Sequence, residues 1–137
     1  MKQSDAADVA TARKKVMIVE DDRELRQLLQ MTLDLRLDVR VVVATDGFMA
    51  LMMARGELPD LILMDLSMPY VDGFTAIELI KADPSTKHIP IMAFSNHIWD
   101  FDWKQKALLL GCVRCLQKSE CVTQLVEIIE QFLDETA

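Results

Sequence analysis

Four short apolar runs in this sequence each end directly on polar side chains that could take part in chemistry. These side chains are three carboxylates, one hydroxyl and one ammonium group: Glu20, Asp21, Asp65, Ser95 and Lys118. If each apolar run is a strand of one parallel sheet, all five lie together, because the carboxyl ends of parallel strands share the edge where ligands bind. The sequence therefore predicts a ligand site assembled from residues that are far apart in the chain.

The residue types of this set indicate phosphoryl chemistry with a divalent cation. Clustered carboxylates repel one another unless a positive charge lies between them. Oxygen ligands with free coordination positions suit Mg²⁺, which keeps several waters and accepts substrate phosphate. A carboxylate beside Mg²⁺ can attack an activated phosphoryl group, while a lysine neutralises the phosphate and a serine donates a hydrogen bond to it. Catalysis at such a site is mostly positioning and charge stabilisation.

The rest of the sequence predicts the elements that hold these residues. Continuous apolar, β-branched character predicts buried strands at 16–19, 39–43, 61–64, 89–94 and 112–117. Helical periodicity predicts helices at 23–35, 46–55, 73–82, 98–110 and 120–133, with Gly56 and Pro59 ending the second and Gly111 the fourth. Five β–α units in strict alternation predict an α/β fold with a doubly wound, five-stranded parallel sheet.

The length and composition suit one globular domain. The chain has 137 residues, of which 51% are hydrophobic and 27% charged, so it can bury a sizeable core. Residues 1–14 are polar and alanine-rich without a sustained pattern, and we predict that they form a flexible N-terminal extension. Residues 15–137 are predicted to be the domain itself, with no linker or second domain.

Charge and hydropathy exclude two classes of partner. The formal net charge is −7, whereas a nucleic-acid-binding module normally presents a basic face, so direct nucleic-acid binding is not expected. No apolar run approaches the length of a membrane span, so no membrane association is expected either. The N-terminus has no apolar segment of a secretory signal, which favours a cytoplasmic location.

Three cysteines are present, and their odd number argues against a disulfide framework. Cys112 and Cys115 form a C-x-x-C pair, but both fall in the run at 112–117 that reads as a strand. Residues three apart on a strand point to opposite faces, and no second pair exists to complete a zinc site. We therefore interpret these cysteines as packing residues.

Four segments, in the right order, resemble the receiver domain of bacterial response regulators, the CheY-like switch of two-component signalling. The segments are V-M-I-V-E-D-D-R-E-L-R at the first strand, L-I-L-M-D-L-S-M-P-Y-V-D-G-F at the third, I-M-A-F-S-N at the fourth and V-R-C-L-Q-K at the fifth. The resemblance covers about residues 15–135. Each segment alone is a weak signal, but four on the expected elements are highly specific.

The resemblance implies a flavodoxin-like (βα)5 fold with strand order 2-1-3-4-5. It also implies that Asp65 is the phosphoacceptor, that Lys118 pairs with the phosphate, and that Ser95 is the switch hydroxyl. The implied Mg²⁺ ligands are Asp21, Asp65, the backbone carbonyl of Ser67 and, through water, Glu20.

By the same resemblance, a sensor histidine kinase or a histidine phosphotransfer protein donates the phosphoryl group. The chain is then a phosphoacceptor switch, not an enzyme acting on a separate substrate, although it catalyses its own phosphorylation and dephosphorylation. The signal passes to a downstream protein effector through the face formed by segments 98–110, 112–117 and 120–133. A homodimer through that face stays open, as does whether the receiver stands alone or belongs to a longer regulator or hybrid kinase.

Three residues depart from the family pattern. Cys115 stands where an inward-turning aromatic residue is common, so we expect weaker coupling of Ser95, or coupling through the loop after the fourth strand. Ser119 replaces the proline that usually follows the lysine, which predicts a trans peptide bond or an unusual, strained one, and Ser119 is also a candidate cap for the last helix. Asn96 is larger than the usual residue after the switch hydroxyl and is expected either to narrow access to Asp65 or to add a hydrogen bond to the phosphate.

The helix at 98–110 carries aromatic residues that bear on the same question. Trp99 and Trp103 lie four residues apart, on one helical face, and are predicted to pack against the sheet. Phe101 lies on another face and is a candidate for an exposed partner contact. His97, next to the switch hydroxyl, is a candidate for tuning the lifetime of the phosphoryl group.

Three other functions fit the sequence less well than a receiver domain does. A non-phosphorylated interaction module on the same fold is supported by Cys115, Asn96 and Ser119 but opposed by the intact acidic residues. A phosphatase of the haloacid dehalogenase type requires D-x-D-x-T or V after the first strand, which the sequence from Glu20 onward does not provide. A dinucleotide-binding enzyme requires G-x-G-x-x-G after a strand, and none is present.

Overall fold

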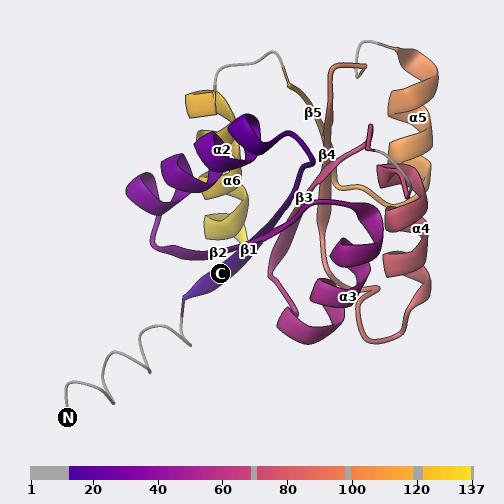
Figure 1. Cartoon of the computed structure of the whole chain (residues 1–137), viewed down its shortest axis with the longest axis horizontal. Helices are drawn as coiled ribbons and strands as arrows, with labels where there is room; N and C mark the ends of the chain where they lie inside the picture. The colour runs from indigo at the N-terminus through magenta and orange to yellow at the C-terminus, as the bar shows by residue number, and fades with distance from the viewer. Residues whose placement is uncertain (1–12, 69–70, 98–99, 119–121, 137) are drawn as a thin grey trace.

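Five parallel strands form the central layer in a computed structural model that describes residues 13–68, 71–97, 100–118 and 122–136. The strand order is β2-β1-β3-β4-β5, which confirms the expected doubly wound, flavodoxin-like α/β fold (Figure 1). The strands are β1 Lys14–Val19, β2 Val39–Ala44, β3 Leu61–Asp65, β4 Ile91–Ser95 and β5 Arg114–Gln117. Every crossover is helical, which is what parallel neighbours require.

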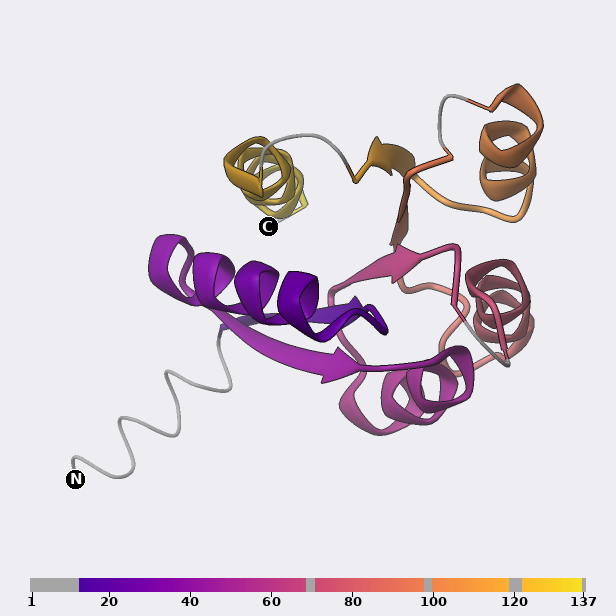
Figure 2. The ribbon, with the colours of Figure 1, turned by 45° about the horizontal axis from the view of Figure 1, so that its top comes forward.

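Helices cover both faces of the sheet (Figure 2). Helices α2 and α6 pack on one face, and α3, α4 and α5 pack on the other. Their bounds are α2 Arg23–Arg36, α3 Gly47–Glu57, α4 Gly73–Ala82, α5 Phe101–Leu109 and α6 Val122–Glu135. Burial on both faces explains why the strands read as continuous apolar runs.

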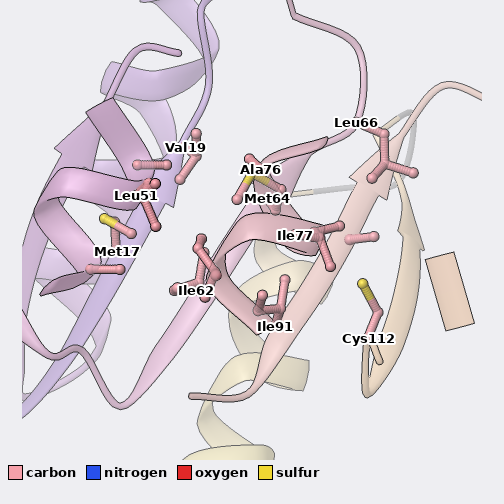
Figure 3. Packing of buried hydrophobic residues seen from close by; sticks show 14 of the residues in the cluster. Met17, Val19, Leu51, Ile62, Met64, Leu66, Ala76, Ile77, Ile91 and Cys112 are labelled. Atoms are coloured by element: carbon pink, nitrogen blue, oxygen red, sulfur yellow. The ribbon is translucent and has the colours of Figure 1, made fainter. Parts of the chain in front are cut away.

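Each strand contributes alternate side chains to two hydrophobic cores. Met17 and Met64 point toward α3 and α4 (Figure 3), whereas Ile18 and Leu63 point toward α2 and α6. All four side chains are fully buried. Because the whole strand is fixed from both sides, the residue that follows it has a well-defined position.

Aspartates begin four of the helices. The carboxylates of Asp22, Asp46, Asp72 and Asp100 accept backbone N–H groups in the first turns of α2, α3, α4 and α5, respectively. Such caps satisfy N–H groups that have no partner within the helix, and each stabilises by about 1 kcal/mol. These caps also fix the short turns at the carboxyl edge of the sheet, where the polar set was predicted.

Two predicted boundaries were wrong for identifiable reasons, and a third cannot be compared in full. Strand β4 begins at Ile91, not at residue 89, because the Ile89 N–H donates to Thr86 and Pro90 has no N–H to offer a strand. Helix α3 passes through Gly56 and ends only when Leu58 adopts a left-handed conformation with φ 47°. The start of the predicted helix at 98–110 includes residues 98–99, which lie outside the described residues, and α5 itself begins at Phe101.

The prediction for the cysteines needs a correction. Strand β5 begins at Arg114, so Cys112 lies in the turn before it, where its N–H donates to Ala107. Cys112 and Cys115 therefore both pack against the core under α4 and α5 and do not point to opposite faces. Burial raises the pKa of the Cys112 thiol to about 12, which suits a packing residue. Cys121 lies outside the described residues.

The N-terminal boundary falls close to the predicted one. Strand β1 begins at Lys14, the last residue of the segment predicted to be an extension, and residues 1–12 lie outside the described part. The division into extension and domain therefore stays a prediction. Among the helices of the described residues, none is long and apolar enough to cross a membrane.

Candidate phosphoacceptor site

The register of the sheet brings the predicted polar residues to one edge. Val19 pairs with Met64, so the residues that follow them, Glu20 and Asp65, emerge side by side. Ser95 pairs with the residue before Lys118, which places the last two members of the set on the neighbouring strands. This is the edge predicted from the sequence, next to the point where the chain order reverses between β1 and β3.

Lys118 joins the two buried carboxylates. Its Nζ lies 2.9 Å from Glu20 Oε1 and 3.1 Å from Asp65 Oδ1. Both carboxylates are fully buried, and the Lys118 side chain is only 14% exposed. The Lys118 backbone is held as well, because its N–H donates to the carbonyl of Ser95 at 3.1 Å. One ammonium group therefore serves two acids from different strands.

Asp65 keeps one oxygen available. Its Oδ1 accepts the Ser67 N–H at 3.0 Å as well as the Lys118 ion pair, whereas Oδ2 is buried and has no hydrogen-bond partner among the described residues. A buried carboxylate oxygen without a partner is costly unless a ligand satisfies it. Gly73 makes room at this point, since a Cβ there would overlap the Asp65 carbonyl oxygen.

Glu20 is held at both carboxylate oxygens. Oε1 faces Lys118, and Oε2 accepts the Asp22 N–H at 3.0 Å. The side chain of Asp21 is exposed beside it. Ligand oxygens of Glu20, Asp21 and Asp65 all lie within 4.8 Å of one another, so the three predicted acids do meet.

The electrostatics of the site fit a further cation. Burial raises the pKa of Glu20 to about 7, and the nearby charge of Asp65 adds to that effect. Burial raises the pKa of Asp65 as well. Burial alone lowers the pKa of Lys118, but its bonds to Glu20 and Asp65 outweigh burial and the net shift is upward. Two buried acids thus share one ammonium, and an additional positive charge would restore the balance.

The donor set suits a hard divalent cation such as Mg²⁺. It consists of carboxylate oxygens, one of them without a partner, and the exposed position of Asp21 leaves room for coordinated water. Ser67 joins the group through its N–H, and its carbonyl oxygen remains a predicted ligand. The residues present therefore fit the magnesium site that the sequence predicts.

Ser95 reaches the edge but contacts the following loop. It is fully buried, and its Oγ accepts the His97 N–H at 3.0 Å. The Asn96 carbonyl accepts the side-chain amide of Gln117 at 3.1 Å. In this structure the hydroxyl is therefore engaged with the loop after β4, the segment through which the sequence analysis expected coupling in the absence of an aromatic residue at position 115.

An aromatic cluster adjoins that loop. The ring centres of His97 and Trp103 lie 4.6 Å apart. Trp103 in turn packs edge-on against Phe74, with 5.1 Å between the two ring centres. Trp103 packs against the core, as predicted, and the Lys106 Nζ lies over the Phe74 ring, 4.4 Å from the ring centre. Phe101 is 70% exposed, as expected of a surface contact. Trp99 lies outside the described residues, as does Ser119 with its predicted trans bond.

Two residues shape the acidic turn in ways that the sequence did not predict. Asp22 caps α2 through its carboxylate and binds Glu20 through its N–H, so its role is structural. The guanidinium of Arg26 donates to the carbonyl of Glu20 at 3.0 Å. An aspartate directly before a helix is a recognisable signal for a cap. The contact of Arg26 had no comparable signal.

The sequence matches the response regulator receiver domain family over residues 16–130, and the chain belongs to this family. It is thus a receiver domain of the two-component response regulators, which confirms the resemblance inferred from the four segments. Receiver domains interact with histidine kinases and with downstream effectors.

Two curated relatives illustrate the range of proteins in which such domains occur. The chain is 33% identical to the polar-differentiation response regulator DivK of Brucella anthropi, over 89% of this chain and 98% of DivK. It is 41% identical to the response regulator PleD of Caulobacter vibrioides over 78 residues, which is 57% of this chain. The matched part spans only 17% of PleD.

Solved structures show the same fold. The phosphorylated cyanobacterial phytochrome response regulator RcpA superposes with a TM-score of 0.76 and 35% identity, over 92% of this chain and 97% of RcpA. The receiver domain of the sensor histidine kinase PA1611 from Pseudomonas aeruginosa superposes with a TM-score of 0.78 and 28% identity, over 88% of this chain and 97% of that receiver domain. That second structure holds a magnesium ion in its active-site cleft.

Proposed function

We propose that this chain is a phosphorylation-dependent switch in which Asp65 accepts a phosphoryl group in the presence of Mg²⁺. The observation that carries the proposal is the state of Asp65: a fully buried carboxylate that is ion-paired with Lys118 at 3.1 Å and keeps Oδ2 without a partner among the described residues. Such a group is costly to maintain for stability alone, because burial disfavours its charge.

The reaction follows from the groups around Asp65. A carboxylate oxygen of Asp65 forms a bond to phosphorus as the bond from phosphorus to the donor's histidine nitrogen breaks, and the imidazole leaves with the electron pair. Lys118 stabilises the negative charge of the transferred group. Asp21, Asp65, the Ser67 carbonyl and, through water, Glu20 would hold Mg²⁺, which would supply further neutralisation of the negative charge.

The proposed conformational change starts from the hydrogen bond that the Ser95 hydroxyl accepts. Its Oγ now accepts the His97 N–H, and a phosphoryl group on Asp65 offers this hydroxyl a charged acceptor instead. Turning toward that acceptor releases the His97 N–H. The change then reaches the α5–β5–α6 face, which a downstream protein effector reads, or through which two copies pair.

The donor in this proposal is a sensor histidine kinase or a histidine phosphotransfer protein in the cytoplasm. The names of the relatives support this, since DivK and PleD are response regulators and PA1611 is a sensor histidine kinase with a receiver domain. The acidic net charge of −7 supports output through a protein, not through direct nucleic-acid contact.

Acetyl phosphate with Mg²⁺ tests the proposal. We expect intact-protein mass spectrometry to show a gain of one phosphoryl group that is lost in Asp65→Asn and in the presence of a chelator. Asp34→Asn, a change of an exposed aspartate on α2, is the matched control and should still gain the group. No gain in the folded wild-type chain would contradict the proposal and favour a non-phosphorylated interaction module on the same fold.

A further inference from the structure

Arg26 holds the backbone of the turn that carries two of the three acids. Its Nη1 donates to the Glu20 carbonyl at 3.0 Å and lies 3.4 Å from the Asp21 carbonyl. The side chain is half-buried on the first turns of α2. A single guanidinium nitrogen therefore spans the two residues whose side chains face the predicted cation.

These two carbonyls have no partner within the helix. The first backbone hydrogen bond of α2 runs from the Arg26 N–H to the carbonyl of Asp22, so the carbonyls of Glu20 and Asp21 precede it. The turn between β1 and α2 is only three residues long, and the Glu20 N–H is tied to Ala44 in β2. The Arg26 side chain thus holds two carbonyls of this turn that, among the described residues, have no recorded hydrogen bond to the sheet or to the helix backbone.

We propose that Arg26 is a positioning residue for the metal site: by holding the two carbonyls, it fixes the directions in which the carboxylates of Glu20 and Asp21 leave the backbone. The inference rests on the proposed function, since it requires Mg²⁺ to bind these acids. Arginine suits the task because its planar, permanently charged fork donates several hydrogen bonds in a fixed geometry.

The sign of the effect separates positioning from simple electrostatics. A guanidinium near a divalent cation repels it, so neutralising Arg26 should strengthen Mg²⁺ binding if charge alone matters. Removing a positioning group has the opposite effect, because groups that orient metal ligands typically contribute about ten- to a hundredfold in metal affinity. The direction of the change therefore identifies the role.

The test is calorimetric titration of MgCl₂ into the full chain. We expect Arg26→Gln to weaken Mg²⁺ binding about tenfold or more, and Arg26→Lys, which keeps the charge but loses the planar fork, to weaken it less. Arg23→Gln is the matched control, because it removes a charge from an exposed arginine of the same helix. It should leave the affinity unchanged or slightly stronger. Glutamine and lysine preserve helix propensity.

The outcomes are distinct. Wild-type binding together with equal or tighter binding by Arg26→Gln would overturn the inference and leave the proposed function intact. A lower melting temperature of metal-free Arg26→Gln with unchanged Mg²⁺ affinity would also overturn it, since that is the signature of a purely structural residue. If Arg26→Gln fails to fold, the affinity of Arg26→Lys decides. If the wild type neither binds Mg²⁺ nor gains a phosphoryl group from acetyl phosphate, the proposed function itself is contradicted, and the inference about Arg26 no longer applies.

Discussion

At the scale of single residues, the site depends on an unequal distribution of charge. Lys118 contacts two fully buried carboxylates, and burial raises the pKa of both acids. A buried ion pair of this kind adds little net stability, because desolvation offsets most of the attraction. The arrangement is therefore better explained by the proposed binding of a cation and a phosphoryl group than by a contribution to the stability of the fold.

This imbalance predicts a pH dependence of stability in the absence of Mg²⁺. The pKa of Glu20 rises from 4.5 to about 7 on folding, so the folded chain binds this proton more tightly than the unfolded chain does. The contribution of Glu20 to stability is therefore fully present below pH 4.5 and is lost as the pH rises through 7. A shift of this size corresponds to roughly 3 kcal/mol.

Urea unfolding of the metal-free chain at pH 5 and pH 8 would measure that contribution. Glu20→Gln should flatten the difference in the free energy of unfolding between the two pH values, whatever its effect on absolute stability. Saturating Mg²⁺ should stabilise the wild type more at pH 8 than at pH 5, because carboxylate ligands must be deprotonated. An identical pH dependence in the wild type and in Glu20→Gln would contradict the assigned cause.

At the scale of elements, the start of α4 positions Asp65, the proposed phosphoacceptor. Gly73 begins this helix directly against the Asp65 backbone, and its N–H donates to the Leu66 carbonyl at 3.3 Å. A Cβ at position 73 would overlap the Asp65 carbonyl oxygen, so glycine is required there for space. Strand β3 and helix α4 can only meet this closely without a side chain between them.

Alanine substitutions at two glycines test whether position 73 has room for a side chain. We expect Gly73→Ala to destabilise the chain by about 2 kcal/mol or more, because the strand or the helix must move. Gly56→Ala, inside α3 where a Cβ meets nothing within 4 Å, should stabilise it by about 0.5–1 kcal/mol. Thermal unfolding of both variants is the measurement, and a Gly73→Ala variant as stable as the wild type would refute the requirement for space.

The contact between the loop after β4 and α5 predicts a fluorescence signal. Ser95 Oγ accepts the His97 N–H, and the His97 ring lies 4.6 Å from Trp103. In a Trp99→Phe background, Trp103 is the remaining tryptophan, and its emission should change when acetyl phosphate and Mg²⁺ are added. Adding Ser95→Ala should suppress this change while the mass gain persists. A Trp103 signal that is insensitive to Ser95→Ala would show that the loop does not transmit the change.

At the scale of the whole molecule, the parallel sheet brings residues that are far apart in the sequence close together in space. Acids from β1 and β3 meet the amine that follows β5 because all strands run the same way and their carboxyl ends share one edge. The opposite edge lies near the start of β1, where Arg13 approaches Asp38 at 3.7 Å. The site and the N-terminal boundary therefore lie at opposite ends of the strands.

This arrangement predicts how much of the N-terminus the domain needs. Deleting residues 1–12 should leave both the melting temperature and acetyl phosphate labelling unchanged, because β1 and Arg13 remain. Deleting residues 1–15 should lower the melting temperature by several degrees, since Lys14 and Lys15 pair with β2 and the Lys15 Nζ forms an ion pair with Glu57 at 2.9 Å. A marked loss of stability in the shorter deletion would contradict the predicted boundary.

The sequence alone was enough to predict the class of fold and to bring the polar residues of the candidate site to one edge of the sheet. Apolar runs of four to six residues, separated by helical periodicity, predict alternating strands and helices because burial on both sheet faces requires them. The polar residues that end these runs could be assigned to one edge, since the topology leaves them no other place. The predicted boundaries were less accurate, because Ile89, Gly56 and Cys112 were assigned to elements by composition. In the structure, backbone hydrogen bonds place Ile89 and Cys112 before their strands, and the left-handed conformation of Leu58 ends α3 beyond Gly56.

Only the tertiary structure decided which partner each polar atom takes. Lys118 bridges Glu20 and Asp65, Ser95 bonds to the His97 backbone, and Arg26 holds the acidic turn. Each of these atoms had several partners of suitable chemistry within the sequence. Periodicity reports how a residue is buried relative to its neighbours in the chain, but the choice among competing donors and acceptors depends on distances between segments that are set when the sheet and helices pack.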